Sequence, residues 1–271
     1  MHHHKAVKLT KKIYARLVDR EWNRLDQDRF RRLEFDMTLR YLKKYLPSKG
    51  LILDAGGGPG RYTIDLAKKG YDIVLLDLTP ANIAMAQDQI IKAKVGKRVK
   101  CVCEGNITDL TRFKSGTFDA VICLGGPLSH VSPETSRIKA VSELLRVAKR
   151  NAPVFVSVMS KYGIMSQGLR AWQHEIGMKT HFTRLVTKGD DHHWHGKYYC
   201  HMFTREELLR LFKKAKVLET VGLEGLSSPA WLEVNTMPVK RWKIWLEAHY
   251  KLCTQPTVVD VSCHILIIAK K

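Results

Sequence analysis

Apolar residues in the first part of the chain recur at helical spacing. Between residues 8 and 45, side chains such as Leu33, Met37 and Tyr41 follow one another every four residues, and a polar stretch at 26–28 interrupts the pattern. Side chains four residues apart lie on the same face of an α-helix. The pattern therefore predicts two helices ahead of the main fold, separated by the polar stretch.

Beyond residue 47, short β-rich runs alternate with helical segments. The runs typical of strands are 51–55, 73–77, 99–103, 120–124 and 154–159, and the helical segments between them are 62–69, 81–94 and 133–148. Strands that alternate with helices form βαβ units, which give a mainly parallel sheet with helices on both faces. The sequence therefore predicts an α/β fold with a doubly wound sheet.

The regular alternation stops after Met159. About forty residues follow without clear periodicity, which is more than an unstructured connection normally has in a compact domain. The segment is rich in histidine and aromatic residues. We therefore predict an insertion at about 160–202 that serves as a lid over a ligand. Order resumes at Thr204, where Thr-Arg-Glu-Glu is a capping box that predicts a helix to about residue 215.

Two further strand-like runs, 217–221 and 262–269, complete the predicted sheet of seven strands. Between them, an insertion at about 226–258 contains an amphipathic helical segment, 239–252. We expect its aromatic side chains to pack against the fold rather than to bind nucleic acid: Trp242, Trp245 and Tyr250. The predicted organisation is a helical cap over residues 1–48 and one domain over 49–271 that carries both insertions.

Composition excludes several classes of protein. Hydrophobic residues make up 45% of the 271 residues and charged residues 27%, which are the proportions of an ordinary globular chain and not of a disordered one. No apolar run approaches the roughly 18 residues that a bilayer span requires, and the N-terminus lacks the apolar stretch of a signal peptide. We expect a cytoplasmic protein without membrane contact. The six cysteines form no C-x-x-C pair, which predicts free, reduced thiols.

The formal net charge of +20 is spread over the whole chain and is not concentrated in a tail. A broad positive field favours anionic partners such as RNA, a phosphorylated metabolite or a charged cofactor. It does not indicate a type of reaction.

The most specific motif is a glycine-rich turn between the first strand-like run and the following helix. The run ends in a carboxylate, Asp54, and four of the next six positions are glycine: Gly56, Gly57, Gly58 and Gly60. Glycine lets the backbone turn with positive φ and approach a ligand without a Cβ in the way. A strand, a glycine turn and a helix in this order predict a loop that binds a nucleotide cofactor.

The spacing of the glycines separates two kinds of cofactor. The dinucleotide fingerprint requires a glycine at the position of Arg61, whereas the last glycine here is Gly60. The order G-x-G-x-G behind an acidic residue resembles motif I of the class I S-adenosylmethionine-dependent methyltransferases. The resemblance implies methyl transfer, with S-adenosylmethionine as cofactor and S-adenosylhomocysteine as its product.

Three later segments agree with this resemblance, which runs over about four-fifths of the chain. Each follows a predicted strand, at the sheet edge where open α/β folds bind ligands. Asp77 and Leu78 lie where the family places an acid against the ribose hydroxyls. Asn106 and Ile107 resemble the segment that contacts adenine, although the family's usual Asp is Asn106 here. Leu124 and Gly125 match the loop under the reactive sulfonium.

The resemblance also directs the choice of catalytic residues. A sulfonium methyl is already activated, so a base is needed only for a weakly acidic acceptor. His130, beside the expected reactive end, is the first candidate, and Tyr162, His174 and His201 are weaker ones on the acceptor side. Residues 21–34 are expected to form part of a cap near the cofactor.

The segment Asp-Asp-His-His-Trp-His at 190–195 contains residue types that occur in metal sites, since imidazole and carboxylate groups are ligands of zinc and iron. Neighbouring histidines on an extended chain point in different directions, and no H-x-x-x-H spacing fixes their geometry. We therefore predict no metal, and read the segment as the polar lining of a lid.

The acceptor is less well defined than the cofactor. The loop after residue 124 lacks the Asn/Asp-Pro-Pro-aromatic pattern of enzymes that methylate amines of nucleobases. We expect transfer to an oxygen, nitrogen or sulfur atom of a small, anionic molecule. Methylation or binding of RNA is the alternative, and an NAD-dependent oxidoreductase is a more distant one. The sequence does not indicate an oligomeric state.

Overall fold

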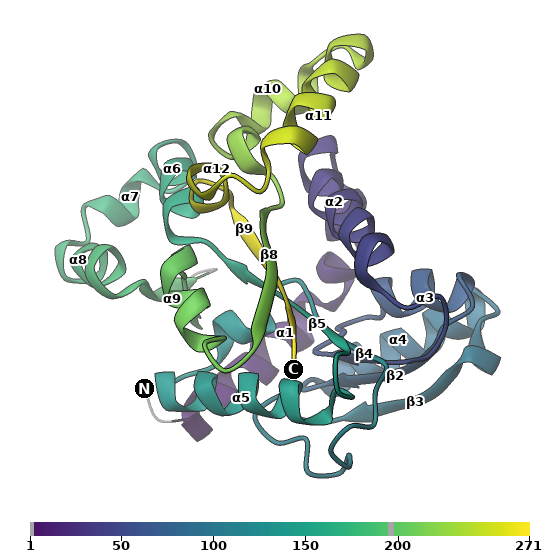
Figure 1. Cartoon of the computed structure of the whole chain (residues 1–271). Helices are drawn as coiled ribbons and strands as arrows, with labels where there is room; N and C mark the ends of the chain where they lie inside the picture. Colours follow the sequence, from purple (N-terminus) through teal and green to yellow (C-terminus); the bar gives the residue numbers. More distant parts are fainter. Residues whose placement is uncertain (1–2, 195–197) are drawn as a thin grey trace.

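The computed structural model describes residues 3–194 and 198–271. Within these residues, seven strands form one sheet in the order β3-β2-β1-β4-β5-β9-β8 (Figure 1). All neighbouring strands are parallel except β9, which is antiparallel to both β5 and β8. The strands are β1 (Leu51–Ala55), β2 (Asp72–Asp77), β3 (Val99–Glu104), β4 (Ala120–Cys123), β5 (Pro153–Met159), β8 (Lys216–Gly222) and β9 (His264–Lys270). The predicted doubly wound α/β fold is confirmed.

The central strands are buried on both faces, so they are largely apolar and do not alternate with polar residues; Asp54 in β1 and Ser157 in β5 are buried exceptions. In β1, Ile52 packs into the core on one side of the sheet and Leu53 into the core on the other. Helices α2, α3 and α4 cover the first side, and α5 and α9 the second. Their bounds are α2 (Arg29–Tyr45), α3 (Arg61–Lys68), α4 (Pro80–Lys92), α5 (Glu134–Val147) and α9 (Arg205–Leu211), with a short 3₁₀ turn η2 (Gly96–Arg98) before β3.

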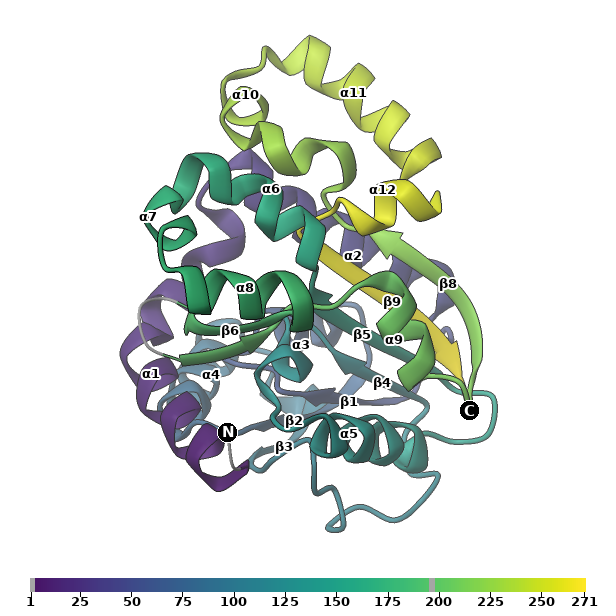
Figure 2. The same ribbon diagram turned by 90° about the vertical axis from the view of Figure 1, so that its left-hand side faces the viewer.

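The segment after Met159, which shows no clear periodicity in the sequence, has regular secondary structure. Its described residues form three short helices and a two-stranded hairpin: α6 (Lys161–Ala171), α7 (Gln173–Ile176), α8 (Lys179–Lys188), β6 (Asp190–Trp194) and β7 (Tyr198–His201). Each element is short and only partly buried, so its apolar residues are too few to give a clear period. Figure 2 shows the hairpin beside α1 (His3–Asn23), the first helix of the chain.

The predicted N-terminal helices are confirmed: α1 contacts α4 and β7, and α2 packs on one face of the sheet. A 3₁₀ turn, η1 (Arg24–Asp26), joins α1 to α2 at the polar stretch. The amide N–H of Phe30 donates to Asn235 Oδ1 (2.9 Å), and an Nη1 of Arg29 donates to the carbonyl oxygen of Val234 (3.0 Å). The start of α2 is therefore fastened to the second insertion.

That insertion consists of η4 (Gly225–Ala230), α10 (Trp231–Thr236), α11 (Val239–Leu252) and α12 (Pro256–Asp260). Its aromatic residues pack as predicted, because Trp242 and Tyr250 contact the core cluster and Trp245 Nε1 donates to Ser227 Oγ (2.8 Å). All six cysteines are free, as predicted, and four of them are buried. No helix of the described residues combines the length and the apolar character that crossing a bilayer requires.

Candidate active site

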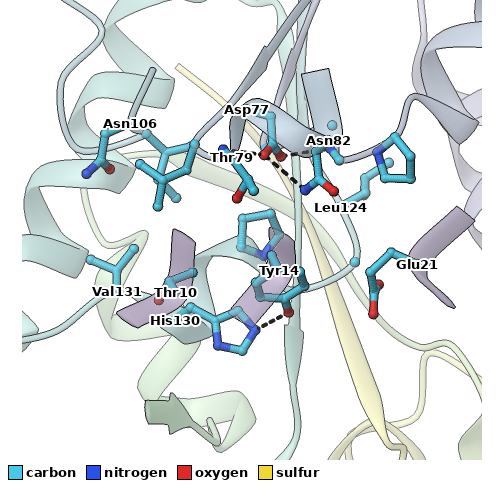
Figure 3. Close-up of a pocket in the computed structure, with 18 of the residues that line it drawn as sticks. Thr10, Tyr14, Glu21, Asp77, Thr79, Asn82, Asn106, Leu124, His130 and Val131 are labelled. Atoms are coloured by element: carbon cyan, nitrogen blue, oxygen red, sulfur yellow. Dashed lines mark hydrogen bonds between the residues drawn. The ribbon is translucent and has the colours of Figure 1, made fainter. Parts of the chain in front are cut away.

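A cavity of about 140 Å³ lies at the carboxyl ends of β1, β2, β3 and β4. Figure 3 shows its polar side chains. Nine residues that the sequence predicted to hold the cofactor line this one cavity: Gly56, Gly57, Gly58, Asp77, Leu78, Asn106, Ile107, Leu124 and Gly125. The structure thus brings together residues that lie on four separate loops.

The glycine turn is held against the neighbouring strand by its backbone. The amides of Gly56 and Gly57 both donate to the carbonyl oxygen of Leu76, at 2.6 and 3.2 Å. A Cβ on Gly56 would lie 2.6 Å from Pro127 Cγ, whereas a Cβ on Gly58, whose φ is +54°, would meet nothing within 4 Å. Gly58 therefore faces open space, which a ligand can approach to backbone contact.

Asp77 organises the polar side of the cavity. Its carboxylate accepts from the amides of Gly58 (2.8 Å) and Thr79 (2.8 Å) and from Asn82 Nδ2 (3.1 Å). Burial raises the pKa of Asp77, and these three donors partly offset that rise. Among the described residues, Asn82 Oδ1 is buried without a hydrogen-bond partner. An unpaired acceptor in the wall of a cavity is the mark of a site built for a ligand with a donor group.

Two residues predicted to bind the cofactor do not line this cavity. Asp54 is buried beneath the loop and accepts from Thr63 Oγ1 (2.7 Å); burial raises the pKa of Asp54 to about 7. Gly60 is the N-cap of α3, and a Cβ there would lie 3.4 Å from Ala86 Cβ. The geometry gives both residues a role in shaping the loop, not in direct contact with a ligand.

Asn106 follows β3 and lines the same cavity. Its Oδ1 accepts from the amide of Thr108 (3.0 Å), which forms a tight turn after β3. The carbonyl-type oxygen has a second lone pair, so it is still able to accept from an amino group.

Helix α1 lies against the cavity. Ala6, Val7, Thr10 and Tyr14 line it on successive turns of the helix. The sequence analysis placed these residues in a helical cap over residues 1–48 but did not single them out as lining a cofactor site, because a stripe of apolar and small residues does not say what it covers. The part of the cap next to the cavity therefore extends beyond the expected residues 21–34 to the start of α1.

His130, the first candidate for a base, is fully engaged in hydrogen bonds. Its Nδ1 lies 3.1 Å from the carbonyl oxygen of Tyr199, which only accepts, so Nδ1 carries the proton. Its Nε2 lies 2.9 Å from the Tyr14 hydroxyl and accepts from it (Figure 3). Burial lowers the pKa of His130 to about 4. The residue is a neutral anchor for Tyr14, and this geometry does not favour the predicted role as a base.

A second, larger cavity of about 590 Å³ adjoins the first. Its walls come from α1, α2, both insertions and the start of β9, and they include the aromatic side chains of Phe30, Trp172 and Trp231. Four residues line both cavities and so mark their junction: Tyr14, Glu21, Arg24 and Gly125. The two cavities therefore meet at these four residues.

The second cavity is lined by charged side chains that the sequence analysis missed. Arg24 contacts both carboxylate oxygens of Glu34, with Nη2 to Oε1 at 2.9 Å. Burial alone would raise the pKa of Glu34, but the Arg24 charge outweighs burial and lowers it. His264 Nδ1 lies 2.6 Å from Glu224 Oε1 in the same wall. The sequence did contain one signal for these charged residues, since Glu34 is a carboxylate on the otherwise apolar face of α2.

The weaker catalytic candidates are scattered. His174 lines the second cavity. Tyr162 is 47% exposed and lines neither cavity. His201 also lines neither: its Nδ1 bonds Asp190 Oδ1 (2.8 Å) and its Nε2 bonds Glu207 Oε1 (2.7 Å). The geometry gives His201 a structural role and leaves Tyr162 without one in either cavity.

The histidine-rich segment lies partly in β6, and His195 falls outside the described residues. Asp191 lines the second cavity and, together with Glu175 and His181, places three possible ligand atoms within 4.8 Å of one another. Burial raises the pKa of Asp191 to about 6. The neighbouring His193 stacks edge-on against His181 with ring centroids 4.5 Å apart, so the cluster is a packed acid–histidine contact.

Comparison with known proteins places this geometry in a family. Residues 52–151 match the family model described as a methyltransferase domain. The chain contains a class I, S-adenosylmethionine-dependent methyltransferase domain. The matched residues run from β1 to the end of α5 and so include all four loops of the first cavity.

Several relatives of this methyltransferase domain are named for small-molecule methylation. A glycine/sarcosine N-methyltransferase of Parasynechococcus marenigrum (strain WH8102) is 32% identical over 137 residues, which are 48% of this chain and 45% of that protein. A ubiquinone biosynthesis O-methyltransferase of Xanthomonas axonopodis pv. citri (strain 306) is 26% identical over 183 residues, 66% of this chain and 70% of that protein. The chain spans about half the length of several relatives that it matches.

A solved structure supports the fold of the methyltransferase domain. The crystal structure of a SAM-dependent methyltransferase from Methanosarcina mazei superposes with a TM-score of 0.58 at 18% identity, covering 85% of this chain and 96% of that one. At 18% identity, the structural similarity shows the fold alone. The acceptor has to be inferred from the residues that line the cavities.

Proposed function

We propose that this protein is an S-adenosylmethionine-dependent methyltransferase that binds its cofactor in the first cavity and a small-molecule acceptor in the second. The observation that supports this most is the junction of the two cavities at Tyr14, Glu21, Arg24 and Gly125. One cavity is built from the family's cofactor loops, and the other opens from its reactive end.

The residues of the first cavity fit the cofactor. Gly58 offers backbone with open space beside it, and Asn82 offers a buried acceptor without a partner. Asp77 is placed to accept from ribose hydroxyls, since an ionised carboxylate has about four acceptor positions and three donors reach it here. The cofactor supplies an activated methyl group. The protein contributes by fixing the two partners in orientation and by excluding water under α1.

The charge of the second cavity argues against the anionic acceptor that the overall charge suggested. Five carboxylates line this cavity (Glu21, Glu34, Glu175, Asp191 and Glu224) against three guanidinium groups (Arg20, Arg24 and Arg31). An anion would meet a surface that is acidic on balance. A neutral or protonated nucleophile, such as a hydroxyl or an amine on an apolar body, fits the carboxylates and the three aromatic walls better.

Two measurements test the proposal. Titration calorimetry with S-adenosylmethionine, S-adenosylhomocysteine and NADH should give binding of the first two only. Asp77→Ala should weaken that binding by roughly 1.5 to 3 kcal/mol, because a charged acceptor of hydrogen bonds is lost. Tight NADH binding without a response to the methyl donor would contradict the assignment.

The acceptor class is tested with labelled methyl donor. Parallel incubations with a small-molecule extract and with total RNA should place label in the small molecules. RNA binding that neutralises six or more phosphates would weaken about a thousandfold between 50 and 200 mM salt. Label in the RNA, together with micromolar binding at physiological salt, would favour the RNA alternative.

A further inference from the structure

The second cavity contains a histidine whose surroundings differ from those of His130. His264 is the first residue of β9, lines the cavity, and keeps 14% of its side chain exposed. Its Nδ1 bonds the carboxylate of Glu224 at 2.6 Å. Glu224 lies in the loop after β8, so the two residues come from segments forty residues apart.

Glu224 is held in place by further donors. Its Oε2 accepts from Ser262 Oγ (2.9 Å) and from the backbone amide of His264 (2.8 Å), and its side chain is buried. A fixed, ionised carboxylate at Nδ1 selects the tautomer with the proton on Nδ1. In the neutral ring the lone pair is therefore on Nε2, the nitrogen that this hydrogen bond leaves for the cavity.

The charges around His264 stabilise its protonated form. Glu34 Oε2 lies 3.8 Å from Nδ1, in addition to Glu224, and Arg24 is the nearest cation. Burial alone would lower the pKa of His264, but the charges of Glu34 and Glu224 outweigh burial and raise it. Arg31 acts on the same group of charges through Glu34.

The same contacts connect His264 with the junction of the cavities. Arg24 lines both cavities, and its Nη2 would lie 3.6 Å from a Cβ on Gly125. Arg24 binds Glu34, and Glu34 lies beside His264. Two side chains, Glu34 and Arg24, therefore connect the imidazole with the loop that the resemblance places under the reactive methyl.

The cluster could be read as a cation site, since Glu34, Glu224 and His264 bring ligand atoms within 4.8 Å of one another. Their hydrogen bonds argue otherwise. Both oxygens of Glu34 contact Arg24, and Oε2 of Glu224 already accepts from two donors. A cation would have to displace a guanidinium group to bind there.

We infer that His264 is the general base for the acceptor and that Glu224 is the residue that positions it. This inference rests on the proposed function. The acceptor's nucleophilic atom forms a bond to the methyl carbon, and the carbon–sulfur bond breaks with its electron pair going to sulfur. The proton of the acceptor passes to Nε2 of His264, and the imidazolium is stabilised by Glu224 and Glu34 until the proton leaves to water.

The first test uses a probe that does not depend on the acceptor. Diethyl pyrocarbonate carbethoxylates neutral imidazole nitrogens, and peptide mass spectrometry assigns the modified residue. In the wild-type protein His264 should react faster than His130 and His201, both of whose nitrogens are hydrogen-bonded. Its reaction should increase with pH through a raised pKa. Modification of His264 no faster than of these two would overturn the inference.

The second test measures methyl transfer to a panel of an alkylamine, a phenol and a thiol. His264→Gln should slow transfer at least about 100-fold, the lower bound for loss of general-base catalysis. S-adenosylhomocysteine binding should change less than twofold. His192→Gln is the matched control, because His192 lines neither cavity, and it should keep the wild-type rate.

Glu224→Gln provides a third variant that keeps an oxygen for Nδ1–H but removes the charge. The rising limb of the pH–rate profile should move to lower pH by about one unit, because an opposite charge no longer favours the imidazolium. A protein that binds cofactor and transfers methyl groups with unchanged rate and pH profile in both variants would refute the base while leaving the proposed function intact. Absence of cofactor binding in the wild type would instead refute the function.

Discussion

The two cavities of this protein are built in different ways. The first is lined by loops that follow β1 to β4, and its polar contacts are mostly to backbone amides and to one carboxylate, Asp77. The second is lined by charged and aromatic side chains from both N-terminal helices, both insertions and β9. A cavity made of backbone is specified by short contiguous motifs. A cavity made of side chains depends on how distant segments pack.

The difference is also electrostatic. In the first cavity the titratable groups near the loop, Asp54 and Asp77, have pKa values raised by burial. In the second, close opposite charges oppose burial at two groups, so the pKa of Glu34 is lowered and that of His264 is raised, whereas burial raises the pKa of Asp191. Glu34 and His264 therefore belong to ionised pairs, whose stability depends on both partners being present.

The largest expected effect follows from breaking such a pair. Arg24→Met should leave the buried Glu34 carboxylate without its cation and lower the free energy of unfolding by about 3 to 5 kcal/mol. Urea denaturation measures this loss. In the double variant Arg24→Met/Glu34→Leu much of the stability should return, because neither charge remains. A double variant as unstable as the single one would mean that Arg24 stabilises the fold by some other contact.

A substitution in the first cavity should weaken cofactor binding, an effect that can be separated from its effect on stability. Gly58→Leu would place a side chain in the open space beside the loop and should weaken S-adenosylhomocysteine binding at least about 100-fold by calorimetry, a change of roughly 2.7 kcal/mol. Gly70→Leu is the matched control, since Gly70 also has positive φ and open space but does not line either cavity. The two variants should lose similar stability through backbone strain. Equal binding in both would place the ligand elsewhere.

His201 lies outside both cavities, so a substitution there should change stability without changing cofactor binding. His201 is bonded by carboxylates at both nitrogens, which requires its protonated form. Burial would lower the pKa of His201, but Asp190 and Glu207 outweigh burial and raise it. The stabilisation is therefore fully present below the unfolded pKa of about 6.5 and is lost as pH increases through the raised folded value.

His201→Gln removes this dependence. The difference in melting temperature between wild type and variant should be largest at acidic pH and shrink toward alkaline pH, while cofactor binding stays the same. A difference that is constant with pH would mean that His201 is not charged in the folded protein.

The smallest expected change concerns Asn106, where this chain departs from the family pattern. Asn106→Asp should keep cofactor binding or tighten it up to a fewfold, because a carboxylate accepts from an amino group more strongly than an amide does. The turn should survive, since Asp is also able to accept from the amide of Thr108. Tenfold weaker binding would show that this segment does not contact the adenine.

The sequence by itself determined the strands of the sheet, the helices between its parallel strands and nine of the residues that line the first cavity. Runs such as 51–55 and 154–159 are largely apolar because central parallel strands are buried on both faces, so their composition identifies them without tertiary information. Gly56, Gly57 and Gly58 were found for a similar reason. A turn that brings backbone to a ligand restricts the residue type locally.

Only the tertiary structure decided which side chains line the second cavity and which groups pack against each histidine. His130, His201 and His264 are equivalent as letters in a sequence, yet one is neutral and buried, one is paired on both sides, and one faces a cavity beside a fixed carboxylate. A titratable group takes its pKa and its lone pair from whatever packs against it. For His264 those neighbours are Glu34 and Glu224, which lie far from it in the chain and meet it only when the sheet and the cap have formed.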